Sequence, residues 1–246
     1  MFIYQILIEY DGTNFVGWQM QKNGPSIQEA IQKNLIKILK EKVILYGSGR
    51  TDSGVHALEQ SAHFITKTKI NKYFFFLNTM NFFLRKKKIS ILKISLKKKN
   101  FHARYSAKKR FYKYEIINRI APLSLDTNKA WHVKSALSIE LIKKAAKYLE
   151  GTKDFSTYRS SSCTAKSPVK TLEKITVEKK GTKISIIFTS KSFLQHQVRS
   201  MVGCLKFVGE KKWSLKKFKD VMNLKKRTFC APPAPAYGLY LKKIKY

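Results

Sequence analysis

The stretch Leu172–Thr189, LEKITVEKKGTKISIIFT, contains two runs in which apolar and polar side chains alternate. Alternation with a period of two is typical of a β-strand that buries one face. The runs Leu172–Glu178 and Lys183–Thr189 flank the polar segment Lys179–Thr182, which contains a glycine and favours a turn. The stretch therefore predicts a hairpin of two antiparallel strands.

Other segments of the chain show the same kinds of pattern. In Phe2–Tyr10 every second side chain is large and apolar or aromatic, and Asp11-Gly12 then favours a turn. Further strands are expected at residues 43–46, 61–65, 89–96, 110–118 and 238–242. Helical spacing predicts helices at residues 26–40, 138–150 and 193–208 and after Ser214, and Ser26 with Glu29 forms a capping box.

Strands mixed with helices, together with the hairpin signal, predict an α+β fold with mainly antiparallel sheets flanked by helices. A boundary near residue 105 divides the chain into two lobes of similar character, 1–105 and 106–246. Two lobes would leave a cleft between them, where a large substrate could bind.

The composition is strongly basic, with 50 Lys and Arg against 15 Asp and Glu, which gives a formal net charge of +35. This charge favours a polyanionic partner, with nucleic acid first and an anionic membrane surface second. Only eight of the basic residues are Arg, and Lys, Ile and Asn are common throughout, as expected from an AT-rich genome. Selection for nucleic-acid binding and mutational bias are both open explanations at this point.

Several classes of protein are excluded by the sequence. No apolar run approaches 18 residues, so no transmembrane helix is expected, and Met1–Tyr10 lacks the basic start of a signal peptide. Cys163, Cys204 and Cys230 form no Cys-x-x-Cys pair, so neither a zinc site nor a disulfide framework is expected. A reducing cytoplasm is the expected compartment.

Asp52 is one of only five Asp residues and lies in Gly49–Ala57, GRTDSGVHA, after a predicted strand. If this segment is extended, Arg50 and Asp52 share one face, and the Arg lowers the pKa of the carboxylate. An ionised carboxylate can act as a nucleophile or a general base, and Gly49 and Gly54 would let a bulky partner approach the backbone. An ordinary turn with a structural ion pair explains the same residues.

A second candidate site is the basic and aromatic run Lys108–Tyr114 on a predicted strand. Tyr112 and Tyr114 share a face with Arg110, which suits an unstacked base and its phosphate, but the same rings could simply pack a sheet. Arg199, near the start of a predicted helix, could bind a phosphate or pair with Asp52, and is otherwise a solvated side chain.

The segment Gly49–Ala57 resembles the signature of the tRNA pseudouridine synthase A family. Further segments similar to that family follow in its order and cover essentially the whole chain. They are Glu9–Thr13, Gly17–Gln19, Ser26–Glu29, Phe101–Arg104, Ser106-Ala107, Tyr112–Tyr114, Asp154–Ser156, Phe193-Leu194, Val198-Arg199, Val202-Gly203 and Gly238–Leu241.

The resemblance implies the pseudouridine synthase fold and the conversion of uridine to pseudouridine at positions 38, 39 and 40 of the tRNA anticodon stem-loop. It implies that Asp52 is the catalytic nucleophile and that Arg50 pairs with it. It also implies that Tyr112 stacks on the target uracil and that Arg199 lines the active site. The N-terminal lobe would then carry the catalytic Asp and the C-terminal lobe the stacking Tyr.

The resemblance further implies tRNA as the partner, a homodimer, and no metal, organic cofactor or membrane. The aromatic patch Tyr73–Phe83 could be an interface or the core of one lobe. Two rivals remain: a methyltransferase that uses Cys163, and a non-catalytic basic tRNA-binding protein or chaperone.

Overall fold

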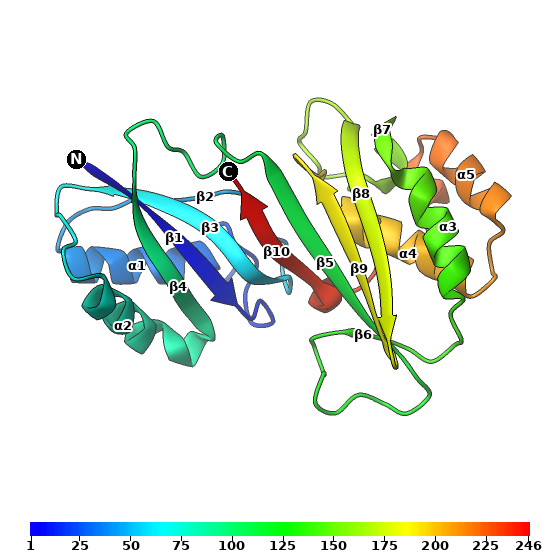
Figure 1. Cartoon of the computed structure of the whole chain (residues 1–246), viewed down its shortest axis with the longest axis horizontal. Helices are drawn as coiled ribbons and strands as arrows, with labels where there is room; N and C mark the ends of the chain where they lie inside the picture. Colours follow the sequence, from blue (N-terminus) through cyan, green and yellow to red (C-terminus); the bar gives the residue numbers. More distant parts are fainter. The chain divides into compact units, whose positions relative to one another are not determined.

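A computed structural model describes residues 1–246 and divides the chain into two compact units (Figure 1). Unit 1 comprises Met1–Lys108 and Tyr240–Tyr246, and unit 2 comprises Lys109–Leu239. The first boundary between the units thus falls after residue 108, whereas the sequence predicted a boundary near residue 105. The end of the chain, expected in the second lobe, belongs to unit 1.

Unit 1 contains a sheet in which β4, β1, β3 and β10 are neighbours in that order, while β2 pairs with β3. All its pairings are antiparallel except that of β10 with β3. Two helices, α1 and α2, pack beside each other in this unit (Figure 1). The elements are β1 (Phe2–Tyr10), α1 (Ile27–Leu39), β2 (Leu45–Gly47), β3 (His56–Thr66), α2 (Tyr73–Leu84), β4 (Ile89–Lys97) and β10 (Leu239–Lys245).

The predicted extents of β1 and α1 are confirmed, but the predicted capping box of α1 is only half formed. Strand β1 has the expected bounds, and its side chains Tyr4, Ile6, Ile8 and Tyr10 are buried. Ser26 caps α1 by accepting a hydrogen bond from the amide of Glu29 at 3.2 Å. The Glu29 carboxylate does not complete the capping box, because it pairs with Lys33 Nζ at 2.6 Å.

Helix α2 corresponds to the aromatic patch that the sequence left without a secondary structure. Phe76, Met80 and Leu84 are buried at a spacing of four residues, whereas Phe74, Phe75 and Phe82 are exposed. The helix has no side-chain cap at its N-terminus. Aromatic residues on both faces and the missing cap hid the helical pattern.

Unit 2 contains a sheet with the order β5-β9-β8-β7, and β6 pairs in parallel with β5. The predicted hairpin is confirmed: β8 and β9 pair antiparallel, and Gly181 has a φ of +58° in the turn between them. Helix α3 packs against β8 and α4. The elements are β5 (Lys109–Asn118), β6 (Trp131–Val133), α3 (Ile139–Leu149), β7 (Gly151–Asp154), β8 (Val169–Lys180), β9 (Lys183–Ser190), α4 (Gln197–Gly209) and α5 (Leu215–Asn223).

Helix α4 begins four residues later than the apolar spacing predicts. His196 adopts a left-handed conformation with φ of 61°, which stops the helix from extending toward residue 193. The Gln197 side chain accepts a hydrogen bond from the amide of Leu194 at 2.8 Å and closes this turn. Local backbone geometry therefore overrides the apolar pattern at this end.

Each unit combines a mainly antiparallel sheet with packed helices, which confirms the predicted α+β class. None of the helices has the length and apolar content needed to cross a membrane. No group of three or more His, Cys, Asp or Glu side chains is arranged to hold a metal ion.

Candidate active site

Asp52 lies in the loop that connects β2 to β3 in unit 1. Because these two strands pair antiparallel, the loop returns the chain at one end of the sheet. Thr51 is buried, Asp52 is half-buried, and Ser53 is exposed. Asp52 therefore lies at the transition from a buried to an exposed part of the loop.

The backbone beside Asp52 is held by the segment that follows β1. The amide of Trp18 donates to the Thr51 carbonyl at 3.0 Å, and the Thr51 hydroxyl lies 2.8 Å from the Tyr10 hydroxyl. On the other side of Asp52, the Ser53 hydroxyl donates to the Phe15 carbonyl at 3.1 Å. These contacts fix the loop on both flanks of the carboxylate, as a site that must orient a reacting group requires.

Two glycines outside the GRTDSGVHA segment permit this close packing. A Cβ on Gly12 would lie 2.1 Å from the carbonyl oxygen of Val55. A Cβ on Gly17, whose φ is +117°, would lie 2.6 Å from the Thr51 carbonyl oxygen. These two glycines pack the loop against the segment after β1. The approach of a bulky partner at Gly49 and Gly54 stays a prediction.

His56 links the same two segments and was missed by sequence reasoning. Its ring is buried, and Nδ1 accepts a hydrogen bond from the Gly12 amide at 3.0 Å, with Asp11 Oδ1 at 3.2 Å. Burial opposes ionisation of Asp11, but hydrogen bonds from the Thr13 hydroxyl and amide hold the pKa of its carboxyl below the usual value. The Asp-Gly turn signal after β1 was the sequence clue to this contact.

Arg50 is exposed, and its Nε donates to Gln19 Oε1 at 3.1 Å. Gln19 belongs to the segment that also holds Thr51. Arg50 and Asp52 belong to the same loop, and this contact ties the guanidinium of Arg50 to the segment after β1. The pairing of Arg50 with Asp52 stays a prediction.

The predicted aromatic face lies on β5 of unit 2. Tyr112 is half-buried, and its ring meets that of Phe193 edge-on with 5.1 Å between centroids. Tyr114 is fully buried and donates to the Pro235 carbonyl at 2.8 Å. Burial raises the pKa of Tyr114 far above its ordinary value, so its hydroxyl remains a donor. Tyr114 therefore packs the sheet, and only Tyr112 keeps exposed surface that could contact a base.

Arg199 lies in the first turn of α4 and is half-buried. Its Nε donates to the Ala234 carbonyl at 2.8 Å, and its own carbonyl accepts from the Ala234 amide at 2.9 Å. The default expectation of a solvated helix side chain is therefore wrong. The loop before β10 holds this guanidinium in a defined orientation.

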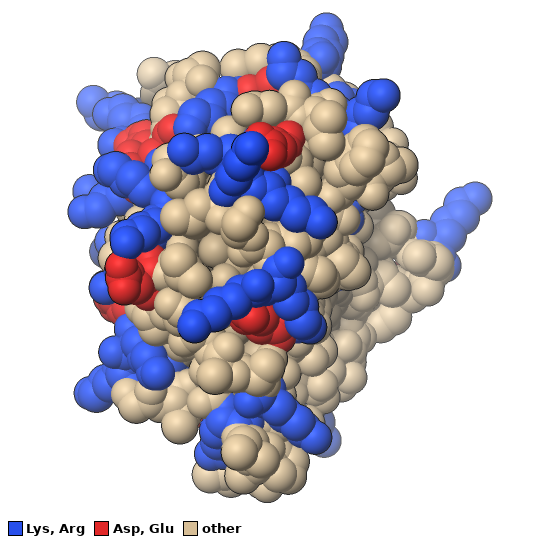
Figure 2. Space-filling view, turned by 90° about the vertical axis from the view of Figure 1, so that its right-hand side faces the viewer, with Lys and Arg blue, Asp and Glu red and all other residues tan.

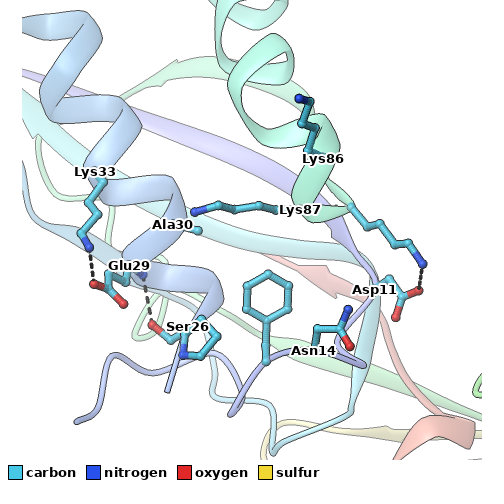
Figure 3. Close-up of a pocket in the computed structure, with 11 residues that line it drawn as sticks. Asp11, Asn14, Ser26, Glu29, Ala30, Lys33, Lys86 and Lys87 are labelled. Atoms are coloured by element: carbon cyan, nitrogen blue, oxygen red, sulfur yellow. Dashed lines mark hydrogen bonds and ion pairs between the residues drawn. The ribbon is translucent and has the colours of Figure 1, made fainter. Parts of the chain in front are cut away.

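A pocket of about 520 Å³ in unit 1 lies beside the segment that supports the Asp52 loop (Figure 3). Asp11 and Phe15 line it, together with the start of α1 and the three lysines Lys86–Lys88. Lys88 Nζ lies 3.6 Å from Asp11 Oδ2, and Lys33 pairs with Glu29 one turn away on α1. Figure 3 shows Lys87 extending toward Ala30 of α1. Sequence reasoning did not identify this pocket.

Comparison with known proteins adds to this geometry. The profile of a family described as tRNA pseudouridine synthase matches residues 6–106 and 145–246. A protein named tRNA pseudouridine synthase A from Pelagibacter ubique (strain HTCC1062) is 57% identical over 246 residues, which cover 100% of both chains. Proteins of the same name from Ehrlichia ruminantium (strain Gardel) and Neorickettsia sennetsu (strain ATCC VR-367 / Miyayama) are each 42% identical over 99% of both chains.

The similarity extends over both units, and the matched ranges include the supported Asp52 loop as well as Arg199. An identity of 57% over the full length of both chains leaves no part of this fold without a counterpart in that relative. The chain therefore belongs to the tRNA pseudouridine synthase family.

Proposed function

We propose that this protein isomerises uridine to pseudouridine at positions 38, 39 and 40 in the anticodon stem-loop of tRNA, with Asp52 as the catalytic residue. The observation that carries the proposal is the Asp52 loop, which is fixed on both flanks by Trp18 and Phe15 and in which Asp52 is only half-buried. Family membership supplies the reaction type, and the loop supplies the reactive group.

The reaction breaks the bond between uracil N1 and ribose C1′ and forms a bond between C5 and C1′. The proton leaves C5 and N1 gains one, so no atom or electron is gained or lost overall. Uracil in an RNA stem is stacked and must be flipped out first, at a cost of about a few kcal/mol. The protein must therefore stabilise a flipped base and supply a nucleophile or base.

Four side chains of this chain fit these tasks. Asp52 attacks the substrate or removes a proton, because an oriented carboxylate can do both. Arg50, held by Gln19, provides positive charge near the loop. Tyr112 offers a partly exposed ring for stacking on the flipped uracil. Arg199, held by Ala234, serves as an oriented cation for a phosphate or carbonyl oxygen.

The surface charge supports an RNA substrate. Figure 2 shows basic side chains spread over one face of the molecule, where they outnumber the acidic ones that lie between them. In unit 1, Lys86 and Lys87 add positive charge to the rim of the pocket beside Asp11. Lysines distributed in this way attract the phosphate backbone without selecting a base sequence. The cytoplasm, where tRNA is modified, is the compartment that this substrate requires.

A homodimer is part of the proposal, and helix α2 supplies the surface. Phe74, Phe75 and Phe82 of α2 have exposed fractions of 70%, 63% and 59%. Exposed aromatic side chains gathered on one helix are typical of a protein interface. Static light scattering at micromolar concentration tests this: a dimer has twice the mass of the 28.5 kDa chain, and a monomer would contradict the proposal.

The function is tested by tritium release from tRNA labelled at uracil C5, with no cofactor added. The wild-type protein is expected to release tritium, and Asp52→Asn is expected to lose at least 10³-fold in rate while still binding tRNA. Asp126→Asn is the matched control, because it removes the same charge from an exposed site and should leave the rate unchanged. Stem-loops with a single uridine at position 38, 39 or 40 identify the positions modified.

The rival functions predict different results. A non-catalytic tRNA-binding protein would bind the RNA and release no tritium in either form. A methyltransferase that uses Cys163 would need a methyl donor and would keep its activity after Asp52→Asn. Either result would overturn the proposal.

A further inference from the structure

Two of the three cysteines lie side by side in unit 2. Cys204 is inside α4 and fully buried, and Cys230 follows the short helical turn Arg227–Phe229 and is half-buried. Their Sγ atoms are 3.5 Å apart, although 26 residues separate them in the sequence. Cys163, by contrast, has no sulfur contact of this kind. The fold therefore brings together two thiols that the sequence showed as scattered.

The surroundings of the pair give the two thiols different pKa values and different exposure. The Cys204 thiol as donor and the guanidinium of Arg227 lower the pKa of Cys230, although burial opposes them. The contact with Cys230 and burial raise the pKa of Cys204. The backbone carbonyl of Ser200 lies 3.9 Å from Cys230 Sγ, and Arg227 donates to the Ser200 hydroxyl at 3.1 Å. Cys230 is thus the more reactive and more accessible sulfur.

We propose that Cys204 and Cys230 form a reversible disulfide when the protein meets a peroxide. The sulfurs must approach by about 1.5 Å to reach the bonded distance of about 2.05 Å. Cys204 is fixed in a helix, but Cys230 lies between a short turn and a Pro-rich loop. Side-chain rotation at Cys230 therefore supplies most of the movement.

The chemistry balances with hydrogen peroxide as the oxidant. The Cys230 thiolate attacks one peroxide oxygen and, with one proton, gives a sulfenic acid and water. The Cys204 sulfur then attacks the Cys230 sulfur, loses its proton, and releases a second water. Two thiols lose two electrons and two protons, and one peroxide becomes two waters. A dithiol reductant reverses the step by thiol–disulfide exchange.

The disulfide would fasten the loop before β10 to helix α4. The loop already packs on this helix, because a Cβ on Gly203 would lie 2.1 Å from the Pro232 carbonyl oxygen. Ala234 in the same loop exchanges two hydrogen bonds with Arg199. The disulfide would therefore constrain the loop that orients Arg199. In this way oxidation of the two cysteines would affect the proposed active site.

The experiment treats the reduced full-length protein with hydrogen peroxide and measures the intact mass. The remaining thiols are then blocked, and the peptides are mapped. We expect a loss of 2 Da per chain, a linked pair of peptides containing Cys204 and Cys230, and full recovery with dithiothreitol. The map of the wild-type protein suffices, so the result does not depend on a variant that folds.

Variants sharpen the assignment. Cys204→Ala and Cys230→Ser should each abolish the mass loss, whereas Cys163→Ser should leave it unchanged. Linkage through Cys163, addition of oxygen to Cys230 without a crosslink, or no change in mass would each overturn the proposal. Tritium release measured on the reduced protein reports on the proposed activity separately, so failure of one does not imply failure of the other.

Discussion

His63 is a single residue whose surroundings create a dependence of stability on pH. It lies on β3, its ring is buried, and its Nδ1 accepts a hydrogen bond from the Ala103 amide at 3.2 Å. Burial and the neighbouring His102 lower the pKa of His63 to about 4. The folded protein therefore holds this ring neutral at a pH where an unfolded chain would protonate it.

Between pH 6.5 and about 4, the unfolded state binds more protons at this residue than the folded state. Stability should fall as the pH is lowered through this window, by on the order of 1 kcal/mol from pH 7 to pH 5. Urea unfolding of wild type and His63→Gln at both pH values measures the effect. A smaller difference between the two pH values is expected for the variant, and an equal difference would contradict the assignment.

At the residue scale, the sequence indicated Asp52 as a candidate catalytic residue but not the residues that hold its loop. GRTDSGVHA is a local pattern and can be read directly. The support from Trp18 and the close approach at Gly12 join segments about 30 to 45 positions apart, so no local pattern reveals them. The burial of Tyr114 beside the half-buried Tyr112 likewise depends on what packs on β5.

At the scale of elements, α2 carries a prediction about assembly. Phe74 and Phe75 are exposed neighbours whose rings meet edge-on at 5.8 Å. If this helix forms the dimer interface, Phe74→Ser combined with Phe75→Ser should weaken the dimer at least 100-fold by removing two aromatic anchors. Light scattering over a dilution series measures this. Leu125→Ser, at a side chain that is 95% exposed in unit 2, is the control and should not shift the equilibrium.

Elements with regular local patterns were predicted from the sequence, and irregular ones were not. Strand β1 and the hairpin of β8 and β9 alternate in sequence and were found as expected. Helix α2 was missed because exposed aromatic rings mask its buried positions, and α4 starts late because His196 is left-handed. The short strand β6 was missed because it is defined by its pairing with β5.

At the scale of the whole molecule, the net charge of +35 predicts that tRNA binding weakens steeply as salt increases. If the basic rim of the pocket contacts the RNA backbone, Lys86→Ala with Lys87→Ala should reduce the log–log salt slope by about 1.5. Filter binding between 50 and 300 mM salt measures both slopes, and the rate at saturating tRNA should stay near wild type. A flat salt response would contradict an electrostatic mode of binding.

The position of strand β10 at the end of the chain has a consequence for folding during synthesis on the ribosome. Unit 1 takes residues 240–246 to complete its sheet, and these follow all of unit 2 in the chain. At about 5–20 residues per second, roughly 10 s of translation separates the two parts of unit 1. During that delay β3 of the nascent chain lacks its neighbour β10. The unpaired edge of β3 is then open to pairing with another chain. The unit that bears Asp52 is thus begun first and closed last, so an interrupted translation product would carry the proposed catalytic loop on an unfinished sheet.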